Sequence, residues 1–199
     1  AAIGSAMQAD DAPACGADEL IARLHSRVAI DMEVERLAPL FDSEADYAAF
    51  IDRQSRYRVL RRPLDGYHGR CFLGIDAGST TTKAVLVDED GAMLYGFYDN
   101  NQGNPLATAI RALREMHDAL PEGAQIAWSC STGYGEALIK AALELDEGEV
   151  ETVAHYTAAA FFDPEVDCIL DIGGQDMKCI TIRDGAVDSV LLNEACSSG

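Results

Sequence analysis

The sequence predicts an α/β fold with an internal duplication, because one pattern occurs twice in its 199 residues. The first copy, IDAGSTTTKAVLVDEDG, covers residues 75–91, and the second, LDIGGQDMKCITIRDG, covers residues 170–185. In each copy an apolar strand ends in Asp, Gly follows two residues later, and Lys stands seven residues after the Asp. Such a turn offers backbone N–H groups to a phosphate, and its carboxylate can hold a metal ion through water. We therefore expect a phosphate-binding cleft between the two copies.

The first part of the chain predicts helices. Residues 1–10 look like the end of a helix of small residues. Apolar side chains spaced as on a helix occur over residues 20–28, and Pro39 limits this helix. Ser43, with Asp46 three residues later, is typical of the start of another short helix.

From residue 71 the predicted elements follow in a regular order. The predicted strands are CFLGID, KAVLVD, AMLYGFYD and QIAWSC. A helix begins at Asn104 and Pro105 after the third strand, and further helices are predicted over residues 137–145 and 150–161. The order restarts at Cys168 with two strands and the beginning of a third, VLLNEA. This order predicts a ribonuclease H-like half followed by the start of its duplicate, with a helical N-terminal segment before them.

These elements divide the chain into a linker and a main domain. We expect a helical linker over residues 15–70 and the main domain over residues 71–199. Within the domain, the first half covers residues 71–165 and the start of the second half covers residues 166–199. Residues 51–72 contain six Arg and two Asp. This basic segment is interpreted either as a solvated part of the linker or as a contact with an acidic partner domain.

Composition excludes several classes of partner. The net charge of −19 argues against binding to nucleic acid or to an anionic membrane, because both would be repelled. The hydrophobic content of 48% is ordinary for a globular core. The six cysteines show no CxxC spacing, and no signal peptide or long apolar span accompanies them. Reduced thiols in the cytoplasm are therefore expected.

Residues 72–199 resemble a known family, through LGIDAGSTTTKAVL, TGYG, the His155 segment, DIGGQDMKCI and LNEACSSG. The family comprises the ATP-dependent activators of 2-hydroxyacyl-CoA dehydratases, which are relatives of the ATPase subunits of benzoyl-CoA reductase. It lies within the superfamily of acetate and sugar kinases, heat-shock chaperones and actin. The resemblance implies an actin-like ATPase that binds ATP and Mg²⁺. It also implies a dimer holding one [4Fe-4S] cluster, from which ATP turnover delivers a low-potential electron to a CoA-ester dehydratase or reductase.

The resemblance implies roles for residues of both copies. The first phosphate loop would comprise Gly78, Ser79, Thr80, Thr81, Thr82 and Lys83. The second phosphate loop would comprise Gly173, Gly174 and Gln175. Asp76 and Asp171 would be the carboxylates around Mg²⁺, acting through water, and Gln175 or Asp176 would orient the attacking water. His155 is interpreted either as a packed or surface histidine or as a ligand.

Cys196 matches the cysteine ligand of the family's iron-sulfur cluster, in the context N-x-x-C-x-x-G. The small residues after it, Ser197 to Gly199, would let the backbone of another chain approach, as a cluster shared between subunits requires. The alternative is a buried structural cysteine. By the same resemblance, the second cluster ligand is expected beyond Gly199.

The resulting hypothesis is a cytoplasmic ATPase that acts as a homodimer or as paired tandem modules. Residues 1–14 would be the tail of an upstream ATPase module, and the 199 residues alone would be inactive. Two alternatives stay open: a small-molecule kinase of the same superfold, which needs no thiolate at position 196, and a scaffold module without catalysis. None of the three hypotheses involves nucleic acid or a membrane.

Overall fold

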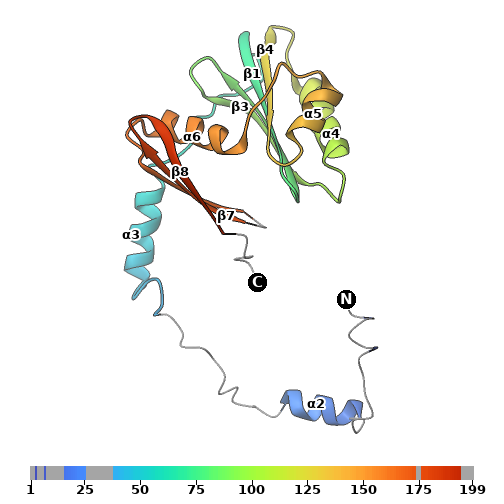
Figure 1. Ribbon diagram of the computed structural model, residues 1–199, viewed down its shortest axis with the longest axis vertical. Coiled ribbons are helices and arrows are strands. Elements are labelled where there is room, and N and C mark those ends of the chain that lie inside the picture. The colour runs from blue at the N-terminus through green and yellow to red at the C-terminus, as the bar shows by residue number, and fades with distance from the viewer. Residues whose placement is uncertain (1–2, 4–6, 8–15, 26–37, 174–175, 194–199) are drawn as a thin grey trace. The chain divides into compact units, whose positions relative to one another are not determined.

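The computed structural model forms two compact units, Ala1–Arg56 and Tyr57–Gly199 (Figure 1). The residues described are 3, 7, 16–25, 38–173 and 176–193. Most of the expected helix over residues 1–10 therefore lies outside the described residues. No helix in the described part of the chain is long and apolar enough to cross a membrane.

The first unit contains two described helices. Helix α2 (Ala17–His25) begins before the predicted start, and residues 26–37 lie outside the described part. Helix α3 (Glu44–Gln54) begins where its capping residue predicted, because the Ser43 side chain accepts a hydrogen bond from the Asp46 backbone N–H at 3.2 Å. The capping interaction fixes the start of α3 locally, so it needs no partner domain.

The second unit contains a five-stranded sheet in the order β3-β2-β1-β4-β5. Its strands are β1 (Gly69–Ala77), β2 (Thr81–Asp88), β3 (Met93–Asn100), β4 (Ala124–Thr132) and β5 (Glu147–Gly148). The first three strands are antiparallel and joined by hairpins, whereas β4 is parallel to β1 and β5 is parallel to β4. Parallel neighbours require crossover connections, which the intervening helices supply. The predicted ribonuclease H-like half is confirmed.

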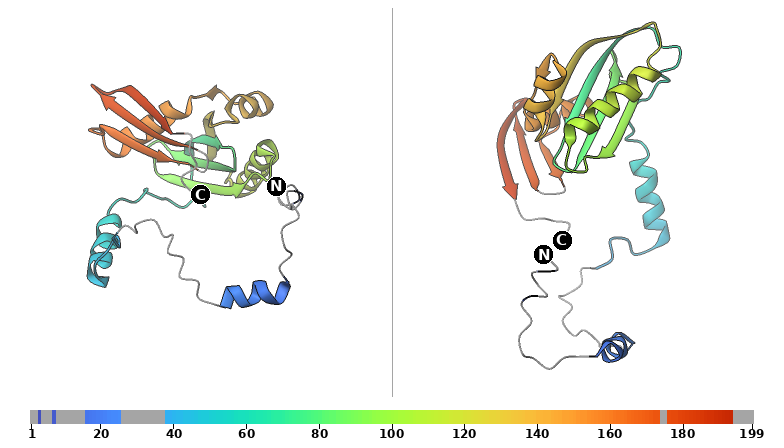
Figure 2. Two further views of the ribbon diagram at one scale, coloured as in Figure 1. Left: turned by 60° about the horizontal axis from the view of Figure 1, so that its bottom comes forward. Right: turned by 90° about the vertical axis from the view of Figure 1, so that its right-hand side faces the viewer.

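Two helices cover one face of this sheet, as the right-hand view in Figure 2 shows for α4. Helix α4 (Pro105–Ala119) begins at Asn104, whose side chain accepts from the Ala107 backbone N–H at 3.0 Å. It buries Ala109, Ala112 and Met116 against the sheet. Helix α5 (Glu136–Leu143) lies beside β4 and ends two residues before the predicted end. The core of this unit therefore lies between these helices and the central strands.

A second sheet contains β6 (Cys168–Ile172), β7 (Met177–Arg183) and β8 (Ala186–Asn193), all antiparallel. Strand β8 is longer than the predicted start of a third strand, because it begins at the hairpin itself. Asp184 and Gly185 both have positive φ there, 53° and 73°, as a two-residue type I′ turn requires. Helix α6 (Glu151–Phe162) contacts β6, and Ile180 of β7 is fully buried.

The two sheets differ in how their equivalent faces are covered. Ile75 and Ala84 of the first copy are buried in the core. Their counterparts 95 residues later, Leu170 and Cys179, lie on the opposite face of the second sheet from α6, and Leu170 is 69% exposed. Within the described residues no helix covers this apolar face. The first half therefore supplies most of the buried core.

Residues 57–70, the C-terminal part of the expected linker, belong to the second unit by their contacts. Leu64 is buried in the core cluster. Arg62 pairs with the buried carboxylate of Asp88 and, at 3.0 Å, with Asp90 in the hairpin between β2 and β3. Part of the positive charge of the basic segment is thus neutralised within the second unit.

Asp88 illustrates how the hairpin is held. Burial alone would raise the pKa of Asp88. The backbone N–H groups of Ala92 and Asp90 donate to its carboxylate, Arg62 pairs with it, and together they lower the pKa of Asp88 below its ordinary value. A lowered folded-state pKa means that this contribution to stability is present above the unfolded pKa and is lost as the pH falls through the folded one.

Candidate functional site

The two copies of the sequence pattern form the same hairpin. In the first copy the Gly78 backbone N–H donates to the Thr81 carbonyl oxygen at 3.0 Å. In the second copy the Gly173 backbone N–H donates to the Asp176 carbonyl oxygen at 2.9 Å. The two hydrogen bonds join equivalent positions. In each copy these are the second and the fifth residue after the Asp of the repeated pattern. The duplication is therefore a structural one, and each hairpin closes at its glycine.

Each hairpin also places its Lys directly opposite its Asp. Asp76 pairs in register with Lys83, and Asp171 pairs in register with Lys178. The Lys83 ammonium donates to Asp76 Oδ2 at 2.9 Å, and the Lys178 ammonium lies 3.7 Å from Asp171 Oδ2. Since directly opposite residues share a face, the spacing of seven residues in the sequence accounts for both pairs.

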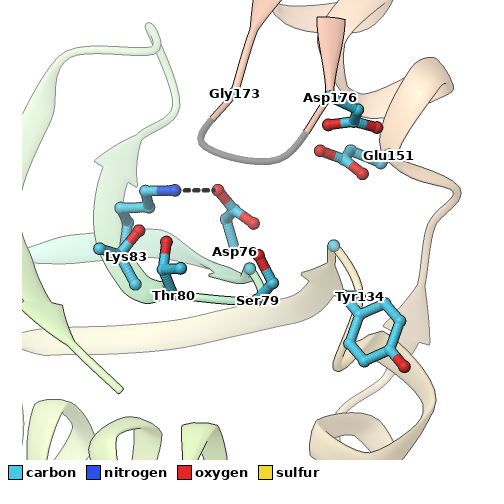
Figure 3. A pocket seen from close by; sticks show the side chains of 11 residues that line it. Asp76, Ser79, Thr80, Lys83, Tyr134, Glu151, Gly173 and Asp176 are labelled. Atoms are coloured by element: carbon cyan, nitrogen blue, oxygen red, sulfur yellow. Dashed lines mark hydrogen bonds and ion pairs between the residues drawn. The ribbon is translucent and has the colours of Figure 1, made fainter. Parts of the chain in front are cut away.

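A cavity of about 450 Å³ lies between the two hairpins (Figure 3). The first hairpin and the end of β1 contribute Asp76, Gly78, Ser79, Thr80, Thr81 and Lys83. The turn after β4, helix α6 and the second hairpin contribute Gly133, Tyr134, Glu151, Gly173 and Asp176. The cavity thus collects residues separated by up to a hundred positions in the sequence, as the duplicated pattern predicted.

The turn after β4 packs against the end of β1 through Gly133. Its φ is +87°, a conformation that side chains disfavour, and a Cβ there would lie 2.6 Å from Asp76 Oδ1. The neighbouring Gly135 N–H donates to the Ala77 carbonyl at 2.8 Å. The TGYG stretch therefore forms a cavity wall that only glycine at position 133 allows.

Asn101 holds the first hairpin through hydrogen bonds made from the buried side. This role of Asn101 was not predicted from the sequence. Its side chain is 2% exposed and donates from Nδ2 to the Gly78 carbonyl at 2.7 Å. Its Oδ1 accepts from the Thr82 hydroxyl at 2.6 Å, and its backbone N–H donates to the Thr80 carbonyl at 2.8 Å. One side chain and one backbone group thus hold both sides of the turn.

Thr82 differs from its expected role as a cofactor-binding residue. It is fully buried and does not line the cavity. Side chains alternate between the two faces of a strand, so Thr82 and Lys83 must point in opposite directions. Because Lys83 faces the cavity, Thr82 faces the core and binds Asn101 there.

Replacing Asn101 by Ala is expected to lower the free energy of unfolding by about 2 kcal/mol, because the Gly78 carbonyl and the Thr82 hydroxyl lose their buried partner. Urea denaturation measures the change. Asn100→Ala is the matched control, since Asn100 is exposed and its side chain accepts a hydrogen bond from the backbone N–H of Gln102, two residues later. Equal stability of both variants would contradict the supporting role of Asn101.

The second hairpin is organised around Lys178. Its ammonium lies 3.1 Å from Glu151 Oε2 and 3.4 Å from Asp176 Oδ2, in addition to its contact with Asp171. Burial opposes the charge, but the hydrogen bond and attraction of Glu151, followed by Asp176, raise the pKa of Lys178. The ammonium therefore stays charged at neutral pH and attracts the three carboxylates of Glu151, Asp171 and Asp176.

The other expected residues of the second half divide into two groups. Asp171 is largely buried and does not line the cavity; its Oδ2 lies 3.5 Å from His155 Nε2. Gly174, Gln175 and Cys196 lie outside the described residues. The roles expected for these three residues stay predictions.

Three cavity residues, Gly133, Tyr134 and Glu151, were not among the expected site residues. Tyr134 belongs to the TGYG stretch but was given no role, and its side chain is 90% exposed. Glu151 is the first residue of α6 and stands four positions before His155, so both lie on one side of the helix. That spacing indicates only that Glu151 and His155 share a helix face, and the place of Glu151 in the cavity depends on how α6 packs.

The charges around the cavity favour a bound cation. Its described lining includes three carboxylates, of Asp76, Glu151 and Asp176, against the single ammonium of Lys83. A polyphosphate placed among these carboxylates would be repelled unless a divalent cation neutralised it. Carboxylates and phosphate oxygens are the ligands that Mg²⁺ uses, so the lining fits a magnesium-bound phosphate chain.

A sequence profile matches residues 73–199, which is more than half of the chain, and its family is described as the BadF/BadG/BcrA/BcrD ATPase family. The chain belongs to this family. The matched region begins inside β1 and contains the whole cavity lining.

Relatives in this ATPase family include named activators. The chain is 29% identical over 128 residues to the (R)-2-hydroxyglutaryl-CoA dehydratase activating ATPase of Acidaminococcus fermentans, and the match covers 64% of this chain and 48% of that protein. It is 31% identical over 129 residues to the activator of lactoyl-CoA dehydratase of Anaerotignum propionicum, with the same two coverages. The chain therefore spans about half the length of the curated relatives it matches.

A solved structure agrees with the family assignment. The activator of the 2-hydroxyisocaproyl-CoA dehydratase from Clostridium difficile, with bound ADPNP, superposes with a TM-score of 0.55 at 26% identity. The superposition covers 64% of this chain and 47% of that one. The actin-like ATPase fold expected from the sequence is thereby confirmed.

Proposed function

We propose that this chain is the nucleotide-binding part of an ATPase that activates a CoA-ester dehydratase or a related reductase. The observation that carries the proposal is the cavity between two equivalent Asp–Gly–Lys hairpins. Membership in an ATPase family supports ATP as the nucleotide. The named relatives, which activate dehydratases of three different CoA esters, support the class of partner.

In this proposal the first hairpin binds the phosphates. Ser79 and Thr80 line the cavity, and their hydroxyls and backbone N–H groups would donate to phosphate oxygens. Lys83 adds a positive charge on the same side. Such a loop positions the phosphate chain without covalent chemistry, which is the main requirement of phosphoryl transfer.

Magnesium would be held from the same side by Asp76, acting through water, because Asp76 lines the cavity whereas Asp171 does not. The ion would neutralise the phosphate charge within the acidic lining. Gln175 or Asp176 would orient the attacking water. The position of Asp176 supports this role, because Asp176 lines the cavity.

In this proposal ATP turnover drives a conformational change, and the conformational change drives electron transfer. Cys196 would be a ligand of a [4Fe-4S] cluster shared between two modules, from which one low-potential electron passes to the dehydratase or reductase. The support is its N-x-x-C-x-x-G context. The proposal places the protein in a reducing cytoplasm, where an exposed cluster and free thiols persist.

The test is to purify the intact protein anaerobically and to measure ATP turnover, iron and acid-labile sulfide. About four irons per pair of modules, together with ATP hydrolysis and a paramagnetic resonance spectrum that responds to ATP, are expected. An iron-free protein that transfers phosphate to a sugar or carboxylate would replace the proposal by a kinase. A protein that binds neither nucleotide nor iron would replace it by a scaffold.

A further inference from the structure

We infer that Glu151 is a further catalytic residue, whose carboxylate binds and orients the water that attacks the terminal phosphate. This inference rests on the proposed ATPase function. The starting observation is that Glu151 lines the cavity from helix α6, whereas the phosphate-binding groups come from the two hairpins. In Figure 3 its carboxylate and that of Asp176 face the cavity across from Asp76.

The attacking water needs acceptors that are not already used by the phosphate loops. Among the described carboxylates of the cavity, Asp76 is bound directly by Lys83 at 2.9 Å. Glu151 instead has one oxygen, Oε2, beside Lys178 at 3.1 Å. Its other oxygen, Oε1, is 3.6 Å from His155 Nε2, beyond ordinary hydrogen-bond distance. With respect to the described residues, Oε1 can therefore accept a hydrogen bond from water.

The position of Glu151 is also held from two sides. It is the first residue of a helix of 12 residues, so its backbone is fixed by α6. Lys178, whose side chain is only 13% exposed, holds Oε2 from strand β7. Lys178 is thus a positioning residue, and it supplies the positive charge that a metal ion would otherwise bring to the cluster of Glu151, His155 and Asp171.

The chemistry balances without another reactant. The water oxygen forms a bond to the terminal phosphorus while the bond from that phosphorus to the bridging oxygen of ADP breaks. A proton of the water passes to Glu151 and then to the phosphate or to solvent, so the products are ADP, phosphate and a proton. Asp176, on the adjacent edge of the cavity, accepts the second hydrogen of the same water. Two acceptors fix the direction of attack.

The test compares Glu151→Gln with Glu147→Gln in the intact protein. The two variants lose the same charge, but Glu147 lies on the exposed strand β5 and does not line the cavity. Glu151→Gln is expected to lower kcat for ATP hydrolysis about 100-fold, while the Kd for ADPNP and the Mg²⁺ requirement change less than twofold. Glu147→Gln is expected to leave all three unchanged.

The outcomes separate this inference from the proposed function. If the wild-type protein does not hydrolyse ATP, the proposed function fails. If the wild type is active and Glu151→Gln has the same kcat, the inference is overturned and the proposed function stands. A variant with unchanged kcat but a higher Mg²⁺ requirement would also overturn it, because Glu151 would then be a metal ligand. Lys178→Met, with normal ADPNP affinity, is expected to reproduce the loss of kcat.

Discussion

Replacing Asp76 by Asn is expected to lower ATP turnover by the intact protein about 1,000-fold, because the substitution removes the charge that we propose holds magnesium against the phosphates. Asp76 ends β1, lines the cavity and contacts both Lys83 and the Gly133 turn. The Asn side chain has nearly the same shape and can still accept from Lys83. The expected change is therefore in kcat rather than in folding.

Asp99→Asn is the matched control for this prediction. Asp99 pairs with Arg111 at 2.6 Å, and its side chain is 43% exposed, compared with 37% for Asp76. Both variants thus lose one carboxylate charge from a half-exposed ion pair, which contributes only about 0–1 kcal/mol to stability. Thermal unfolding should be similar in the two variants. Turnover of the Asp76 variant within threefold of the control would contradict the assigned role.

Replacing Cys196 by Ser is expected to remove the proposed iron-sulfur cluster completely, from about four irons to none per pair of modules, because an alkoxide is not formed at neutral pH and a neutral hydroxyl binds iron weakly. Nucleotide affinity should remain, since every described cavity residue is unchanged. Iron and sulfide analysis of the anaerobically purified intact protein measures the first effect, and ADPNP binding measures the second.

The control for the cysteine variant is Cys168→Ser. Cys168 is an exposed thiol on β6, with its sulfur 3.8 Å from that of Cys179, so this variant removes one thiol without touching Cys196. The Cys168→Ser variant should keep its iron. Equal iron in the Cys196 variant and in the wild type would exclude Cys196 as a ligand, whereas loss of iron in both variants would indicate a general effect of thiol loss.

Much of the site could be predicted because the informative contacts are local in sequence. A tight hairpin places the residue seven positions after Asp76 directly opposite it, and the same holds for Asp171. The pairing of each Asp with its Lys follows from strand geometry alone. The same geometry also determines that Thr82 points into the core, so that exception was predictable from the alternation of side chains.

The residues that could not be predicted are those whose partners are distant in sequence. Asn101 follows β3 in an ordinary turn sequence, and its role depends on β3 returning beside the first hairpin. Glu151 reaches the cavity only because α6 packs beside β6. This packing also brings Glu151 next to Lys178. No spacing in the sequence encodes either contact, since each requires two separately formed elements to meet.

The sequence by itself determined the duplicated hairpins, the order of the elements and the family of this protein, because turns, caps and strand register depend on neighbouring residues. Only the tertiary structure decided which polar side chains share one cavity. It placed Gly133, Tyr134 and Glu151 in the cavity wall, turned Thr82 toward the core and left Asp171 out of the cavity lining. The physical reason is that a cavity forms where packed elements meet, and packing is set by the whole core rather than by any one segment.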